Sequence, residues 1–149
     1  MKSFLPSMFY YGFPVVLLTT IDKDGNADVT PISCNFTLGT NAVIALVKLN
    51  KAYHNVMEVP EVVFNLPSAE MWEKVEAIAP YTAQNPVPPQ KVGKYAYTDD
   101  KFAIGGFTKL PSEKVRVPRI AECPIQAEAV VKQVNDRGTY ALIELEFVQ

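Results

Sequence analysis

The stretch V-V-L-L-T-T-I-D-K-D-G-N-A-D-V-T-P-I-S, residues 15–33, decides the fold. Residues 15–21 are all apolar or β-branched, a composition that favours a strand. Asp24-Gly25 supplies the residues that a tight hairpin turn requires, and residues 27–33 return as a second strand. The stretch therefore predicts an antiparallel β-hairpin near the start of the chain.

Four further segments have the length and composition of strands: 42–48, 61–66, 125–134 and 139–148. Asp136-Arg137-Gly138 is expected to turn between the last two, and alternate residues of 125–134 are expected to share one face of the sheet. Those alternate residues are Ile125, Ala127, Ala129 and Val131. Six strands with hairpin connections predict a mostly β, Greek-key-like antiparallel barrel that removes its edges by closing on itself.

Helices are expected to be few. Residues 50–59 predict one or two helical turns, and residues 99–106 predict another short helix. Ser68 is expected to cap a longer helix whose apolar side contains Met71, Val75 and Ile78 or Ala79. Seven of the 12 prolines fall between residues 80 and 124, so this part is expected to be an ordered or semi-ordered excursion from one domain that spans residues 1–149.

The composition argues against several classes of partner. The chain has 14 basic and 16 acidic residues without runs of like charge, which argues against binding to nucleic acid or to an anionic membrane. Its start is interrupted by Pro6, Gly12 and Pro14, and we expect neither a membrane span nor an export signal. Cys34 and Cys123 are far apart, which predicts a reducing cytoplasm and no structural disulfide.

Common catalytic motifs are absent from the sequence. His54 is the single histidine, so histidine-based zinc sites cannot form, and no metal is expected. The seven glycines form neither G-x-G-x-x-G nor a phosphate loop. Spacing alone allows a Ser or Cys nucleophile with His54 as its base, but no G-x-S-x-G elbow supports that interpretation.

Three polar segments adjoin the predicted strands: residues 33–36, 50–55 and 65–68. Strand ends and the loops beside them are where a barrel presents polar groups to a ligand. Taken singly, each segment also has a structural explanation as a bulged strand end, a half-buried helix or a cap. Likewise, Cys34 could be a small buried residue, and Trp72 and Phe102 could belong to the core or to an interface.

Several stretches taken together resemble the flavin reductase-like, flavoredoxin-like family. These are F-P-V-V-L-L-T-T-x-D-x-D-G-N-A-D-V-T-P-I-S from Phe13, V-V-F-N-L-P-S from Val62, D-K-F at 100–102, and P-R-I-A-E-C-P-I-Q-A-E-A from Pro118. The resemblance extends from about Pro14 to Phe147. It implies an FMN-binding split β-barrel that is usually a homodimer.

The resemblance also implies a cofactor site for FMN, or alternatively FAD. The flavin ring and ribityl chain would lie along residues 33–36, and the phosphate would be held by residues 51–55. Residues 65–66 at a strand end and residues 101–102 at a helix start would approach the same pocket. The implied residues are Ser33, Cys34, Asn35, Phe36, Lys51, Tyr53, His54, Asn55, Asn65, Leu66, Lys101 and Phe102. If Lys51 makes a charged hydrogen bond to the phosphate, Lys51→Ala should weaken FMN binding by ~1–3 kcal/mol.

This chain departs from the family pattern at several positions. Tyr53 stands where relatives have Ser or Thr, and Gly39-Thr40-Asn41 replaces an acidic-Pro-Pro stretch. The last hairpin has no histidine, and the sequence given ends at Gln149 where relatives continue into a tail. The first two changes bear on phosphate binding, and the missing histidine bears on reductase activity.

The resemblance implies an NAD(P)H-dependent flavin reductase that passes hydride from NADH or NADPH to flavin N5. No catalytic acid or base is expected, because the chemistry belongs to the cofactor. Two subunits would each contribute to a flavin near the dimer interface, and the electrons would pass to a second acceptor such as a redox partner protein, or the reduced flavin would be released. Two alternatives remain open: a flavoredoxin-like electron carrier without its own NAD(P)H activity, and a dimeric scaffold without cofactor.

Overall fold

The predicted first hairpin is present in the computed structural model, which describes residues 11–149. Val16 pairs with Ile32 and Ile21 pairs with Ala27 across the two strands. The strands of the chain are β1 Val16–Ile21, β2 Ala27–Ile32, β3 Asn35–Leu38, β4 Asn41–Val47, β5 Glu61–Leu66, β6 Lys109–Leu110, β7 Arg119–Ile120, β8 Ile125–Asp136 and β9 Tyr140–Phe147. The α-helices are α1 Lys51–Glu58, α2 Trp72–Ile78 and α3 Lys101–Gly105, and the 3₁₀ turns are η1 Ala69–Met71 and η2 Pro89–Lys91.

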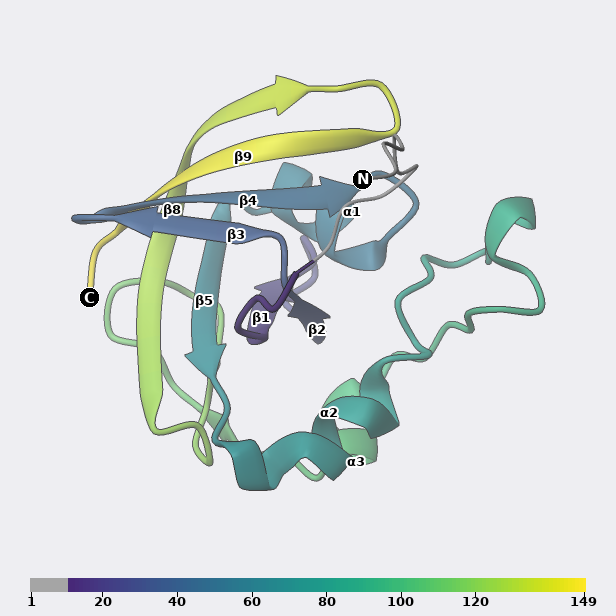
Figure 1. Cartoon of the computed structure of the whole chain (residues 1–149), viewed down its shortest axis with the longest axis horizontal. Helices are drawn as coiled ribbons and strands as arrows, with labels where there is room; N and C mark the ends of the chain where they lie inside the picture. The colour runs from purple at the N-terminus through teal and green to yellow at the C-terminus, as the bar shows by residue number, and fades with distance from the viewer. Residues whose placement is uncertain (1–10) are drawn as a thin grey trace, which may run out of the picture.

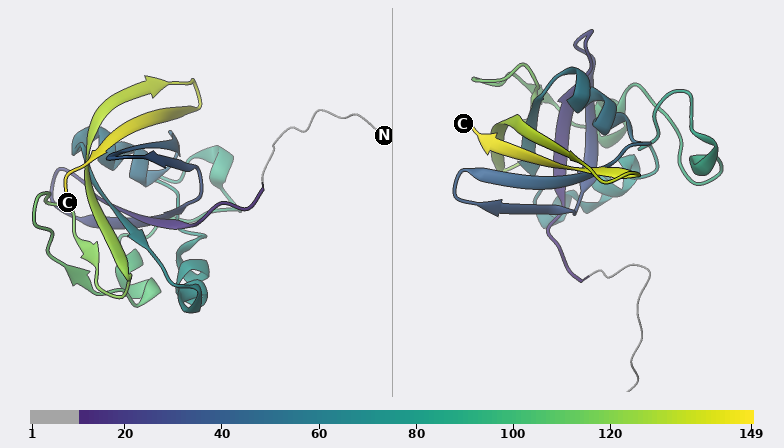
Figure 2. Two further views of the ribbon diagram at one scale, coloured as in Figure 1. Left: turned by 60° about the vertical axis from the view of Figure 1, so that its left-hand side comes forward. Right: turned by 90° about the horizontal axis from the view of Figure 1, so that it is seen from above.

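Seven strands form one antiparallel sheet in the order β2-β1-β5-β8-β9-β4-β3. The sheet curls strongly because the long strand β8 bends from one half of it to the other, as Figures 1 and 2 show. A register shift between Val131 and Gln133 lies within β8, where an irregularity of this kind increases bend and twist. The architecture is the mostly β split barrel that the sequence predicted.

One detail of the predicted barrel was wrong. The edge strands β2 and β3 follow each other in the chain but do not pair, so within residues 11–149 the sheet is a curled half-barrel. The sequence analysis missed β3. Its apolar residues Phe36 and Leu38 are 62% and 72% exposed, so the strand has no apolar face toward the core that would mark it as a strand. The two-residue strands β6 and β7 also escaped prediction because they are too short to show alternation.

Two groups of buried side chains hold the helices against the sheet. The concave side of the curl encloses Val16, Ile44, Phe64 and Ile143, and α1 adds Ala52 and Val56 to the same cluster. On the other side of the β1–β2 hairpin, α2 and α3 pack through a cluster that comprises Leu17, Val29, Met71, Ile78, Phe102, Phe107, Ile120 and Cys123. Figure 1 shows α2 and α3 together below the sheet.

The predicted helices are present, but their ends differ in detail. Ser68 makes no capping hydrogen bond through its side chain, and the segment begins with η1 before α2. Asp100 caps α3 by accepting the Ala103 N–H at 3.0 Å, and Gly106 ends the helix with a left-handed φ of 59°.

Other local expectations had mixed outcomes. Ala129 is in the core and Ala127 and Val131 pack against the same cluster, as expected, whereas Ile125 at the start of β8 is 57% exposed. The Pro-rich segment around residues 80–100 forms a long loop between α2 and α3, drawn in teal in Figure 1. Within residues 11–149 no helix has the length and apolar character needed to cross a membrane. The expectation that the start of the chain contains no export signal rests partly on residues 1–10, which lie outside the described residues.

Candidate functional site

Ser33 and Cys34 connect the two edge strands of the curled sheet. The Asn35 N–H donates to the Ser33 carbonyl at 3.0 Å, and the Cys34 carbonyl accepts the Ala45 N–H at 3.0 Å. These bonds fix the connection against β4. Cys34 is exposed, so the interpretation of this residue as a small buried side chain was wrong. The connection therefore presents its thiol and hydroxyl groups at the surface.

A cavity of about 540 Å³ opens beside this connection, and we call it the Lys91 cavity. It lies between the β2–β3 connection, the end of β4 and the Pro-rich segment. Its lining residues are Pro31, Ile32, Ser33, Cys34, Ala45, Leu46, Val47, Asn50, Ala79, Thr82, Lys91 and Tyr95. Two of the predicted site residues, Ser33 and Cys34, thus contribute to one cavity with polar groups from distant parts of the chain.

The ammonium of Lys91 is the charged group of this cavity. Its Nζ donates to the Thr82 hydroxyl at 3.0 Å, to the Thr82 carbonyl at 3.2 Å and to the Asn50 amide oxygen. It also lies 4.9 Å from the centre of the Tyr95 ring. Burial, and secondarily the charge of Lys101, lowers the pKa of Lys91 to about 8. The cavity therefore contains a buried cation that is hydrogen-bonded by neutral groups.

An apolar hollow of about 330 Å³ lies on the outer face of the sheet, and we call it the Phe36 hollow. Its lining residues are Phe13, Cys34, Asn35, Phe36, Val43, Ile44, Ala45 and Leu142. The Asn35 amide donates to the Pro14 carbonyl at 3.4 Å. Because Cys34 and Ala45 line both this hollow and the Lys91 cavity, the two spaces are neighbours. An apolar space thus adjoins one that contains a buried ammonium.

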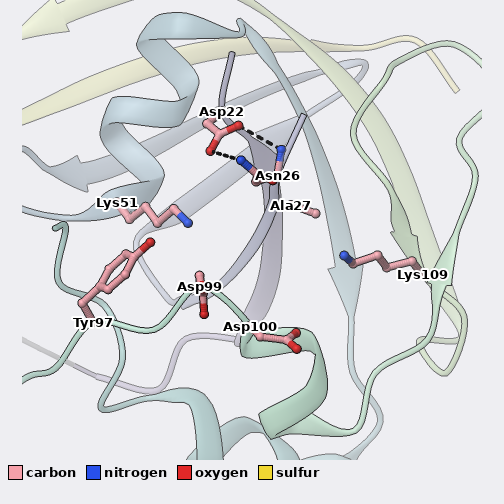
Figure 3. A pocket seen from close by; sticks show the side chains of 8 residues that line it. All are labelled: Asp22, Asn26, Ala27, Lys51, Tyr97, Asp99, Asp100 and Lys109. Carbon is pink, nitrogen blue, oxygen red and sulfur yellow. Dashed lines mark hydrogen bonds between the residues drawn. The ribbon is translucent and has the colours of Figure 1, made fainter. Parts of the chain in front are cut away.

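Lys51, predicted beside the phosphate, lies in a different cavity of about 500 Å³, shown in Figure 3. Its ammonium is 5.3 Å from the centre of the Tyr97 ring. The lining residues are Asp22, Asn26, Ala27, Lys51, Tyr97, Asp99, Asp100 and Lys109. This Lys51 cavity shares no lining residue with the Lys91 cavity, so the side chain of Lys51 is separate from Ser33 and Cys34.

Asp22 organises one wall of the Lys51 cavity. Its carboxylate accepts the backbone N–H groups of Asp24 and Asn26 and the Asn26 side-chain amide, at 2.9–3.0 Å. Burial opposes its ionisation, but these hydrogen bonds outweigh burial and lower the pKa of Asp22. The wall is therefore a self-contained turn whose hydrogen bonds are local.

The other predicted residues of α1 do not face Cys34 either. His54 is exposed and lines a hollow of about 340 Å³ together with Lys51 and Asn55. Its ring meets Tyr53 edge-on with the ring centres 5.5 Å apart, and Tyr53 packs against the core inside the sheet. The buried Asn55 donates its amide to the Thr20 hydroxyl at 3.0 Å.

Asn65 has a structural role in this fold. Its buried amide donates to the Leu17 carbonyl at 3.0 Å and to the Thr19 hydroxyl at 3.2 Å, and its oxygen accepts the Ile120 N–H at 2.8 Å. It therefore joins β1, β5 and β7. The neighbouring Leu66 lines a separate hollow with Trp72, a residue that is 62% exposed.

Lys101 and Phe102 are also buried by the protein itself. The Lys101 ammonium pairs with the Asp28 carboxylate at 3.0 Å and donates to the Thr30 hydroxyl at 3.3 Å. Burial lowers the pKa of Lys101, although the Asp28 carboxylate opposes the change. Phe102 belongs to the cluster under α2 and α3, as its alternative interpretation as a core residue predicted.

The sequence analysis missed Thr82, Lys91 and Tyr95 as candidates. All three lie in the Pro-rich segment, which has no periodicity to indicate which side chains turn inward. Asn50 was within a polar segment of interest but was not selected. The usable signal was its place at the start of the predicted helical segment 50–59, because a polar residue at a helix start can contact whatever approaches the first turn.

Comparison with known proteins places the chain in a family. Residues 8–149 match the family described as the flavin reductase like domain. The chain is 35% identical over 150 residues to the uncharacterized protein YdfE of Bacillus subtilis, a match that covers 97% of this chain and 72% of the relative. It is 28% identical over 116 residues to an uncharacterized protein of Methanothermobacter thermautotrophicus, of whose length 47% is covered.

Solved structures share the fold. Flavoredoxin of Desulfovibrio vulgaris has a TM-score of 0.80 at 20% identity, with 100% of this chain and 75% of that chain covered. Flavoredoxin from Methanosarcina acetivorans has a TM-score of 0.81 at 17% identity, with 100% and 73% covered. The Streptomyces globisporus NADH:FAD oxidoreductase has a TM-score of 0.71 at 13% identity, with 92% and 74% covered. On the family match and this shared split-barrel fold, the chain belongs to the flavin reductase-like family.

Proposed function

We propose that this protein is an FMN-binding oxidoreductase that uses NADH or NADPH as electron donor. The observation that carries the proposal is the pair of adjoining spaces at Cys34, one apolar and one cationic. An FMN molecule has the same two parts, an aromatic ring system and an anionic phosphate. Membership of the flavin reductase-like family supports the assignment to flavin-related oxidoreductases.

The side chains at Cys34 fit a flavin in size and chemistry. Cofactor pockets commonly have volumes of about 300–1,000 Å³, and the two spaces measure about 540 and 330 Å³. Ser33 and Asn35 offer hydroxyl and amide groups for the heteroatoms at a flavin edge, and Phe36 offers an apolar wall. Residues 33–36 would therefore hold and orient the ring.

The protein needs no catalytic acid or base for this reaction. When bound, the flavin supplies the redox chemistry, since its N5 accepts hydride from a nicotinamide nucleotide. The task of the chain is to hold the ring in position and to leave one face open to the donor. Phe36 is 62% exposed, which supports a ring site open to a second molecule or subunit.

We further propose that the protein is a homodimer. Four apolar side chains of β3, β4 and β9 are unusually exposed: Phe36, Leu38, Val47 and Tyr140. Exposed apolar side chains on an edge strand and on the strands beside it favour association, because an uncovered apolar edge strand is otherwise a liability. Leu38→Glu should convert a dimer to a monomer in light scattering coupled to gel filtration. A dimer that survives this change would place the interface elsewhere.

The visible spectrum during an FMN titration tests the proposed function. FMN should bind with a shifted flavin spectrum, and NADPH or NADH should then bleach the flavin band under anaerobic conditions. Wild-type protein that takes up neither FMN nor FAD would overturn the flavin proposal. That outcome would instead favour the dimeric scaffold without cofactor.

The electron carrier is a second candidate because of the last hairpin. Its turn carries Asp136, Arg137 and Gly138, and Asp136 is paired with Lys48 at 2.6 Å. No histidine is present there to approach a nicotinamide. Bound flavin that stays oxidised with both nicotinamide nucleotides, but is reduced by another donor such as dithionite, would favour the carrier.

A further inference from the structure

The buried Lys91 has an uncompensated charge. Its side chain is 8% exposed, and its ammonium contacts an amide oxygen, a hydroxyl and a carbonyl. It takes part in none of the ion pairs formed among residues 11–149. A buried ammonium without a carboxylate is costly, because neutral hydrogen bonds replace only part of the hydration that the charge loses. An anion in the cavity would remove that cost.

Asn50, the residue before α1, contributes a polar group to the same cavity. Asn50 occupies the N-cap, but its side chain makes no capping bond and its amide oxygen faces Lys91 instead. The first turn of this eight-residue helix has no acidic residue to balance its positive end. Asn50 thus faces the ammonium in the same cavity, and the Lys51 N–H that follows it donates to the Thr82 carbonyl at 3.4 Å.

The surrounding groups are suited to a phosphate. An ammonium has three hydrogens, and here two of the three acceptors belong to Thr82. A phosphate oxygen can accept from Lys91 in place of one of them, and the Thr82 hydroxyl retains a hydrogen to donate. The cavity also reaches Ser33 and Cys34, so its other end is the place proposed for the flavin ring.

We infer that Lys91, rather than Lys51, binds the phosphate of the flavin, and that it makes the site selective for FMN over riboflavin. This inference rests on the proposed function, because the ligand is the flavin of the same site. It assigns a binding role to the Pro-rich segment, which delivers Lys91 and Thr82 to the cavity.

Parallel titrations with FMN and riboflavin test the inference, since the two ligands differ only in the phosphate. In Lys91→Met, which keeps the length and apolar stem of the side chain, FMN should bind about 10- to 100-fold more weakly, the usual loss for a charged hydrogen bond. Riboflavin affinity should change by less than about twofold. Lys91→Arg should recover most of the preference for FMN, because it restores the charge.

Lys94→Ala is the matched control, because Lys94 is an exposed lysine of the same segment. It should leave both affinities within about twofold of wild type. Equal losses for FMN and riboflavin in Lys91→Met would overturn the inference and indicate a structural role. Wild-type protein that binds the two flavins equally would also overturn it while leaving the proposed function intact. Failure of wild type to bind any flavin would instead remove the proposed function, and the inference with it.

Discussion

Two buried lysines of this chain have opposite surroundings. Lys101 on α3 is 1% exposed and lies 3.0 Å from the Asp28 carboxylate of β2. Lys91 in the Pro-rich segment is 8% exposed and has only neutral partners. The charge of Lys101 is neutralised by Asp28 within the protein, and this ion pair joins α3 to the sheet. The ammonium of Lys91 has no carboxylate partner among residues 11–149, and it faces a cavity.

The contrast also separates the residues suggested by family resemblance into two groups. Asn55, Asn65 and Lys101 satisfy their polar groups inside the protein and so maintain the fold. Ser33 and Cys34 line a cavity. A polar residue at a matching position can therefore contribute to a flavin site indirectly, by holding the strands that carry the residues in contact with the ligand.

The largest expected effect comes from breaking the Lys101 pair. Asp28→Ala leaves a buried ammonium without its carboxylate and should lower the free energy of unfolding by about 3–5 kcal/mol. Urea denaturation followed by circular dichroism measures the loss. Asp99→Ala, which removes an exposed aspartate, should change it by less than about 0.5 kcal/mol. A loss below about 1 kcal/mol for Asp28→Ala would show that the pair does not stabilise the fold in this way.

Glu128 is a buried anion whose partners, like that of Lys101, lie within the protein. Its carboxylate accepts the N–H groups of Glu113, Lys114 and Val115 at 2.6–3.2 Å. Burial opposes its ionisation, but these bonds prevail and lower the pKa of Glu128 below its usual 4.5. Glu128→Gln should lower the free energy of unfolding at pH 7 by about 2 kcal/mol.

The pH dependence of Glu128 has a definite sign. Because its folded pKa is lowered, its ionised form contributes stability above pH 4.5, and that contribution is lost as the pH falls through the folded pKa. Urea denaturation between pH 7 and pH 3 should show a smaller acid-induced loss in Glu128→Gln than in wild type. Parallel pH curves for the two proteins would contradict this assignment.

Lys91→Met should have a much smaller effect on stability than Asp28→Ala. Removal of an uncompensated buried charge should leave the free energy of unfolding of the flavin-free protein within about 1 kcal/mol of wild type at pH 7. The pKa of Lys91 is about 8 in the folded protein and 10.5 ordinarily, so the folded state binds fewer protons between these values. Wild-type stability should therefore gain a contribution from Lys91 as the pH rises from 8 to 10.5.

Denaturation of both proteins at pH 7 and pH 10 measures this contribution. Relative to Lys91→Met, the free energy of unfolding of wild type should be higher at pH 10 than at pH 7. A loss of several kcal/mol in Lys91→Met at pH 7 would remove the contrast between the two lysines, since Lys91 would then support the fold as Lys101 does.

The smallest effect is expected at Lys51. The family resemblance predicts a phosphate contact for this residue, but its ammonium lies beside Tyr97 in the Lys51 cavity. Lys51→Ala should therefore weaken FMN binding by about twofold, as expected for a distant, partly screened charge. Flavin titration measures it beside Lys91→Met. A larger loss in Lys51→Ala than in Lys91→Met would restore the assignment that the resemblance suggested.

The sequence could predict those parts of the fold that repeat a local pattern. The hairpin at Asp24-Gly25 and the pair β8–β9 have alternation and turn residues that act over a few positions. β3 could not be found in that way, because Phe36 and Leu38 face outward from an edge strand. Neither side chain is part of the buried core.

Only part of the candidate site could be predicted from the sequence. Ser33 and Cys34 interrupt a strand-rich region with polar groups, which is a local signal. Lys91 and Thr82 reach the same cavity through a Pro-rich loop, and their positions depend on contacts more than 30 residues away, such as that between Lys91 and Asn50. No periodic pattern encodes such a contact, so only the folded chain reveals which lysine is buried.

A crystal structure of the protein with FMN bound would show directly which lysine holds the phosphate. The flavin ring is expected beside Cys34 and Phe36, with a phosphate oxygen about 3 Å from the Lys91 Nζ atom. A phosphate beside Lys51 and Tyr97, with Lys91 still bonded only to Asn50 and Thr82, would contradict it.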